Sequence, residues 1–114
     1  MNPNKIKEHI DSKILTFLNI NSLIQSIYYL DDLIEKFMSR DSFIPYDEKY
    51  LVDNWVKIPI KTRYTTYYVL MCIERRAKIK WLIDNKYSRL SDINDKSKFK
   101  LILFKERIDE LHIS

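Results

Sequence analysis

Apolar residues recur at intervals of three and four positions through most of the chain, which is the spacing of one face of an α-helix. The first run follows Pro3, a residue that suits the first turn of a helix, with Asn2 as its cap. The second run follows Ser22, a favoured N-cap residue. We therefore predict helices over residues 3–18 and 23–37, with apolar faces formed by Ile6, Ile10, Ile14 and Phe17 and by Leu23, Ile27, Leu30, Ile34 and Phe37.

The segment 39–46 contains Asp41, Ser42 and Pro45, which favour turns, so the chain is expected to reverse there. Asp47 is a suitable N-cap for a short third helix, which Pro59 would limit. The apolar residues of this segment are Leu51, Val52, Trp55 and Val56.

The run from Arg63 to Ile73 is ambiguous, because β-branched and aromatic residues crowd it and periodicity does not separate a buried strand from a buried helix. Residues 74–86 have a clear helical pattern, and no breaker separates them from this run. We therefore favour one helix over residues 62–85. It would be apolar on nearly every side in its first half, which is typical of a helix at the centre of a bundle.

After a polar stretch over residues 88–96, Ser97 is a suitable cap for a last helix. Its apolar face would consist of Leu101, Phe104, Ile108 and Leu111. No stretch resembles an interdomain linker. The sequence therefore predicts an all-α fold, in which residues 1–114 form a single-domain bundle of four to five helices.

The composition is unusual, because the 114 residues include no Gly, only three Pro and a single Ala, Ala77. Depletion of these three residue types is typical of an AT-rich genome, which suits an accessory protein of a virus or a parasite. Without Gly, backbone positions with positive φ are expected to fall to Asn or Asp. The candidates are Asn19, Asn21, Asn85 and Asn94.

The single cysteine, Cys72, lies within an apolar run, where a buried reduced thiol is the ordinary occupant. This usage indicates a reducing compartment. The N-terminal residues have no apolar core, and no apolar run approaches the roughly 20 residues that a spanning helix needs. We expect an intracellular protein, cytoplasmic or nuclear and with a virus-infected cell included, that makes no use of a membrane.

Familiar catalytic and cofactor sites lack their essential residues in this sequence. Phosphate-binding loops need glycine, and zinc sites need clusters of Cys and His, whereas this chain has only Cys72, His9 and His112. Two acidic groups could in principle bind Mg²⁺, but solvated helix faces explain them equally well. These groups are Asp31, Asp32 and Glu35, and Glu106, Asp109 and Glu110. We expect no enzyme, no catalytic or metal-binding residues, no cofactor and no small-molecule substrate.

The leading hypothesis is a non-enzymatic helical module that binds another macromolecule, either a protein partner or a second copy of the chain. Its basis is an excess of apolar side chains, since two Trp, eight Tyr and several residues outside the helical faces are more than one small core readily hides. Aromatic residues are also favoured at the centres of protein interfaces. The candidate interface residues are Trp55, Trp81, Phe99, Ile102 and Leu103.

The alternative is a small nucleic-acid-binding protein that uses residues 57–86. The net charge is +4, and aromatic residues are interleaved with cations in this region, as in platforms for single-stranded nucleic acid. At about 100° per residue, however, Arg75, Arg76, Lys78 and Lys80 scatter around the helix axis. The candidate contact residues are Lys61, Arg63, Arg75, Arg76, Lys78, Lys80 and Lys86.

Overall fold

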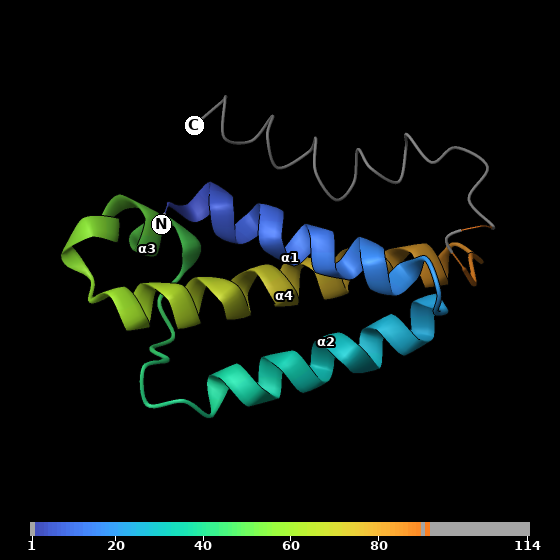
Figure 1. Cartoon of the computed structure of the whole chain (residues 1–114), viewed down its shortest axis with the longest axis horizontal. Helices are drawn as coiled ribbons and strands as arrows, with labels where there is room; N and C mark the ends of the chain where they lie inside the picture. Colours follow the sequence, from blue (N-terminus) through green and yellow to red (C-terminus); the bar gives the residue numbers. More distant parts are fainter. Residues whose placement is uncertain (1, 90, 92–114) are drawn as a thin grey trace.

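The described part of the chain, residues 2–89 and 91 of a computed structural model, is all-α and contains no strand. Its elements are α1 (Pro3–Leu18), α2 (Leu23–Met38), α3 (Glu48–Asp53), the 3-10 turn η1 (Trp55–Lys57) and α4 (Ile60–Asp84). Figure 1 shows α1 and α2 running along α4, with α3 near the start of α4. The predicted all-α bundle is confirmed for this part of the chain, and the predicted last helix lies outside the described residues.

The three predicted N-caps bind the first turns of their helices. The Asn2 side chain accepts a hydrogen bond from Lys5 N at 3.0 Å, and the Asp47 side chain accepts one from Tyr50 N at 2.7 Å. Ser22 forms a capping box, in which its hydroxyl accepts from Gln25 N at 3.2 Å and its own N–H donates to Gln25 Oε1 at 2.8 Å. These caps satisfy N–H groups that the helix itself leaves without acceptors.

The run from Arg63 to Ile73 is helical, as continuity with the following segment predicts. Its threonines fit a helix because the loop before α3 binds their hydroxyls. Thr65 Oγ1 lies 2.8 Å from Ser42 Oγ, and Thr66 Oγ1 accepts from Ile44 N at 3.2 Å. Most of the crowded apolar residues of this run are buried, namely Tyr67, Tyr68, Val69, Met71 and Cys72, whereas Ile73 at its end is exposed.

Helix α4 packs against each of the other three helices and forms the centre of the fold. From α1 it receives the predicted apolar face, in which Ile6, Ile10 and Ile14 are buried. From α2, Leu23 and Leu30 are fully buried, whereas Ile27, Ile34 and Phe37 are partly exposed. The core on α4 itself consists of Tyr67, Tyr68, Val69, Met71, Cys72, Ile79 and Leu82.

The predicted third helix is shorter than its apolar pattern indicates. It ends at Asp53, and the chain continues as η1. The reason lies at Asn54, whose side-chain amide and backbone N–H both donate to the carbonyl of Tyr50, at 2.9 and 3.0 Å. Asparagine binds nearby backbone groups in this way and so favours helix ends. Of the apolar residues predicted for this helix, Leu51 is buried, whereas Val52 within α3 and Val56 in η1 are exposed.

The prediction that asparagines would adopt positive φ is wrong for the described residues, among which only Lys86 does so, with φ 75°. Asn85 is the C-cap of α4 with φ −92°, and Lys86 follows it. Lys86 N donates to Ile83 O at 2.9 Å and Tyr87 N to Leu82 O at 3.1 Å, which is the Schellman pattern. This pattern requires the left-handed conformation one residue after the cap, and in this chain a lysine occupies that position.

The chain after α4 returns to the start of α2, where Leu23 N donates to Ser88 O at 2.9 Å and Ser22 pairs with Arg89 in an isolated bridge.

No helix in the described ranges combines the length and the apolar character that crossing a membrane would require.

Candidate functional site

The most deeply buried charged side chain in the described fold is Arg75, which is 0% exposed. Its Nε and Nη2 donate to the two carboxylate oxygens of Asp11 on α1, the second at 3.1 Å, and its Nη1 lies 3.2 Å from Glu74 Oε1. A fork-to-fork pair of this kind is specific in geometry as well as charged. Arg75 therefore joins α1 to α4. Because it is buried, it is inaccessible to a ligand, in contrast to its predicted role as a nucleic-acid contact.

A second buried charge, Lys7, lies where α1, α3 and α4 meet. Its Nζ is 3.8 Å from Glu48 Oε1 and 5.6 Å from the centre of the Tyr67 ring. The Tyr67 hydroxyl donates to the same Glu48 oxygen at 3.4 Å. The charged groups of this cluster are thus directed at one another, and they position α3 against α1 and α4.

The other predicted nucleic-acid contacts are dispersed. Arg76 pairs with Asp31 on α2, and Arg63 Nη1 donates to Trp55 O at 2.9 Å. Lys78 is partly buried. Three of the seven predicted contacts have exposed side chains on or just after α4, namely Lys61, Lys80 and Lys86. The structure does not gather the seven cations into one surface, and for the six other than the buried Arg75, contact with nucleic acid stays a prediction.

The two tryptophans of the predicted interface occupy different environments. Trp55 is partly buried and packs edge-on against Tyr67, with ring centres 5.5 Å apart. Trp81 is 50% exposed on α4. It shares a helix face with Ala77 and Ile73, which precede it at intervals of four residues, and Ile73 is 46% exposed. We call these three residues the α4 stripe. The other predicted interface residues, Phe99, Ile102 and Leu103, lie outside the described residues.

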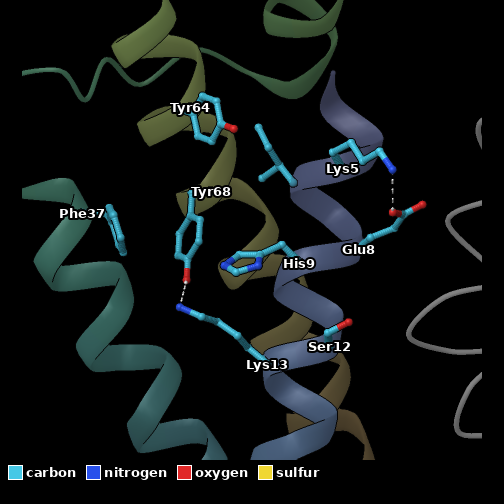
Figure 2. A pocket seen from close by; sticks show the side chains of 9 residues that line it. Lys5, Glu8, His9, Ser12, Lys13, Phe37, Tyr64 and Tyr68 are labelled. Atoms are coloured by element: carbon cyan, nitrogen blue, oxygen red, sulfur yellow. Dashed lines mark hydrogen bonds and ion pairs between the residues drawn. The ribbon is translucent and has the colours of Figure 1, made fainter. Parts of the chain in front are cut away.

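A cleft of about 630 Å³ opens between α1, the end of α2 and the first half of α4. Figure 2 shows Tyr64 and Tyr68 of α4 and Phe37 of α2 on one side of it and the imidazole of His9 on the other. The Phe37 and Tyr68 rings are tilted against each other with centres 4.3 Å apart. Lys13 Nζ donates to the Tyr68 hydroxyl at 3.4 Å. The lining residues are Lys5, Ile6, Glu8, His9, Ser12, Lys13, Phe37, Tyr64 and Tyr68.

This cleft was not anticipated from the sequence. Tyr64 and Tyr68 share a helix face, and Tyr68 is 8% exposed whereas Tyr64 is only partly buried. Lys13 belongs to no sequence motif, and His9 is exposed on α1. The site forms because three helices separated in sequence converge, and no local pattern signals that convergence.

The two remaining candidates for chemistry are the thiol of Cys72 and the acidic groups that could bind a metal ion. Cys72 is fully buried, and burial raises the pKa of its thiol to about 12, so the nucleophilic thiolate is not formed near neutral pH. Among the described residues, no three side chains of His, Cys, Asp or Glu gather where they could hold a metal ion. The second acidic group, Glu106, Asp109 and Glu110, lies outside those residues.

Comparison with protein-family models, with curated proteins and with solved structures finds no significant match to this chain.

Proposed function

We propose that the chain is a non-enzymatic helical interaction module that binds protein through the α4 stripe, with a second copy of the chain as the partner. The observation that carries the proposal is the exposure of about half of Trp81 and Ile73 on one helix face. Tryptophan is among the residue types most enriched at interface centres, because it contributes a large apolar area with few rotatable bonds.

The α4 stripe is self-complementary. Its large residues, Ile73 and Trp81, flank the small side chain of Ala77 at equal distances of four residues. If two α4 helices cross in antiparallel orientation at Ala77, Ile73 of each copy lies against Trp81 of the other. A two-fold interface requires this reciprocity, and a small residue at the crossing point allows the helices to approach closely.

Sedimentation velocity over a range of protein concentrations tests the proposal. We expect reversible dimerisation of the wild-type chain, weakened about 30-fold by Trp81→Lys or Ile73→Lys, which corresponds to a hot-spot loss of about 2 kcal/mol. In a Trp55→Phe background, Trp81 becomes the reporter, and its fluorescence emission should shift to shorter wavelength as dimers form and bury it.

Ile24→Lys is the matched control, since Ile24 is 51% exposed on α2 and lies outside the α4 stripe. It should leave the dimer intact. A wild-type chain that stays monomeric up to about 1 mM would contradict the proposal, because a specific dimer would have a lower dissociation constant. A dimer whose dissociation constant is unchanged by both stripe substitutions would contradict it as well.

A further inference from the structure

The cleft between α1, α2 and α4 has the size of a ligand site and lies apart from the α4 stripe. Its volume of about 630 Å³ falls within the roughly 300 to 1,000 Å³ of typical small-molecule pockets. Its floor includes the buried residues Ile6 and Tyr68, which helix packing holds in place. Such a site is formed before a ligand arrives, so little ordering entropy is lost on binding.

The walls favour a planar ring. Tyr64, Tyr68 and Phe37 contribute three aromatic side chains from two helices, and His9 adds a fourth flat ring from α1 (Figure 2). The Phe37 ring is already held between Tyr68 and Arg40, whose guanidinium carbon lies 4.1 Å from the ring centre. Tyr68 is itself the ring partner of Phe37 and is 8% exposed, so stacking on a ligand falls mainly to Tyr64 and His9. Aromatic side chains of this kind bind bases by stacking.

The polar groups favour an anion. Lys13 Nζ lies 3.4 Å from the Tyr68 hydroxyl, and burial raises the pKa of that hydroxyl to about 12, so it keeps its proton and can donate. Lys5 and Glu8 form an ion pair at 3.9 Å, and Figure 2 shows this pair directed away from the aromatic rings. The one carboxylate of the lining is thus balanced by Lys5, and the net charge of the lining is positive.

We propose that this cleft binds a nucleotide, with the base against Tyr64 and His9 and the phosphate beside Lys13. A nucleotide combines the planar ring and the anionic group that the lining favours. The same chemistry occurs in a free mononucleotide and in one unit of a single-stranded nucleic acid. This site shares Tyr64 and Tyr68 with the predicted nucleic-acid region at residues 57–86, but its cation, Lys13, and His9 lie on α1.

Titration of the full chain, followed by amide chemical shifts, tests the proposal with four probes: uridine monophosphate, adenosine monophosphate, uridine and a single-stranded oligouridylate. We expect at least one phosphate-bearing probe to shift signals of residues near His9, Lys13 and Tyr64. Uridine should bind about tenfold more weakly than its monophosphate, because it lacks the charge-assisted contact. Binding of both monophosphates and the oligomer indicates a free nucleotide site, and binding of the oligomer alone indicates single-stranded nucleic acid.

Two pairs of variants locate the contacts. Lys13→Met should weaken binding about tenfold, whereas Lys80→Met, which removes the same charge from an exposed position of α4, should leave it within about twofold. Tyr64→Leu should weaken binding, and Tyr64→Phe should preserve it, because phenylalanine retains the ring. Thermal melting of each variant checks that the fold is retained.

Three results would overturn the proposal: no probe binds at about 10 mM, uridine binds as well as its monophosphate, or affinity depends on Lys80 and not on Lys13. The last result would instead support the region 57–86. Because Trp81→Lys alters no residue of the cleft, it should not change nucleotide binding, so this test and the dimerisation test can fail independently.

Discussion

At the scale of single residues, charge serves mainly to hold helices together. Arg75 and Arg76 are adjacent on α4, yet one binds Asp11 of α1 and the other Asp31 of α2. Residues one position apart point about 100° from each other around a helix, so a pair of neighbouring cations can reach two flanking helices. The adjacent arginines, which resemble a basic patch in the sequence, thus join α1 and α2 to α4.

Loss of one partner from the buried pair should be costly. We expect Asp11→Leu or Arg75→Met to lower the free energy of unfolding by about 3 to 5 kcal/mol, because each leaves a buried charge without its main counter-ion. The double variant Asp11→Leu with Arg75→Met should recover much of this loss, since apolar side chains of similar size can replace a buried pair. Denaturant unfolding of the four proteins in a double-mutant cycle measures the coupling.

The exposed ion pair of Lys49 and Asp53 on α3, with atoms 2.6 Å apart, is the control for this cycle. Water screens that pair, so Lys49→Met should leave the unfolding midpoint unchanged. If Lys49→Met and Arg75→Met change the free energy of unfolding equally, Arg75 is not buried with Asp11.

At the scale of elements, α2 shows how one helix divides its residues between core and solvent. Leu30 is 0% exposed against α4, whereas Ile24 on the same helix is 51% exposed. Both are aliphatic and lie within the helix, so they differ chiefly in environment. This contrast allows a direct test of how α2 packs.

Leu30→Asp should unfold the domain or nearly so, because it places a charge without a counter-ion in the core, at a cost of several kcal/mol against a stability of about 5 to 15 kcal/mol. Ile24→Asp should change the free energy of unfolding by no more than about 0.5 kcal/mol, as surface substitutions usually do. Circular dichroism melts of both variants measure the difference. If Leu30→Asp melts like the wild type, α2 does not pack through this face.

At the scale of the whole molecule, α4 carries the titratable groups whose burial links stability to pH. Burial raises the pKa of the Cys72 thiol from 9.0 to about 12 and that of the Tyr68 hydroxyl from 10.0 to about 12. The folded state therefore retains protons that the unfolded chain releases above about pH 9. Ionisation then favours the unfolded chain, so these groups reduce stability progressively between about pH 9 and pH 12.

The Cys72→Ala variant tests this dependence. It should be less stable than the wild type near neutral pH because it loses buried volume, and the difference in melting temperature should narrow as the pH rises above about 9. Differential scanning calorimetry from pH 7 to pH 11 measures the difference. A constant difference across this range would show that the thiol ionises equally readily in the folded and unfolded chains.

The helices of the described region could be predicted because their signals are local. Ser22, Asn2 and Asp47 bind backbone groups three residues away, and apolar residues three and four apart share a face whatever the tertiary structure. Two local details were still missed. The side-chain amide of Asn54 donates to the carbonyl of Tyr50 at the early end of α3, and Lys86 adopts the left-handed conformation where an asparagine was expected.

Which side chains lie together depended on the tertiary structure, because contacts between residues far apart in sequence leave no periodic trace. The residues of the cleft come from three helices, and Lys13 lies 55 positions from the hydroxyl of Tyr68 that it contacts. Likewise, Asp11 lies 64 positions from Arg75, and only their contact distinguishes that arginine from a surface cation. Helix formation follows from neighbours along the chain, whereas charge burial and binding surfaces follow from how the helices pack.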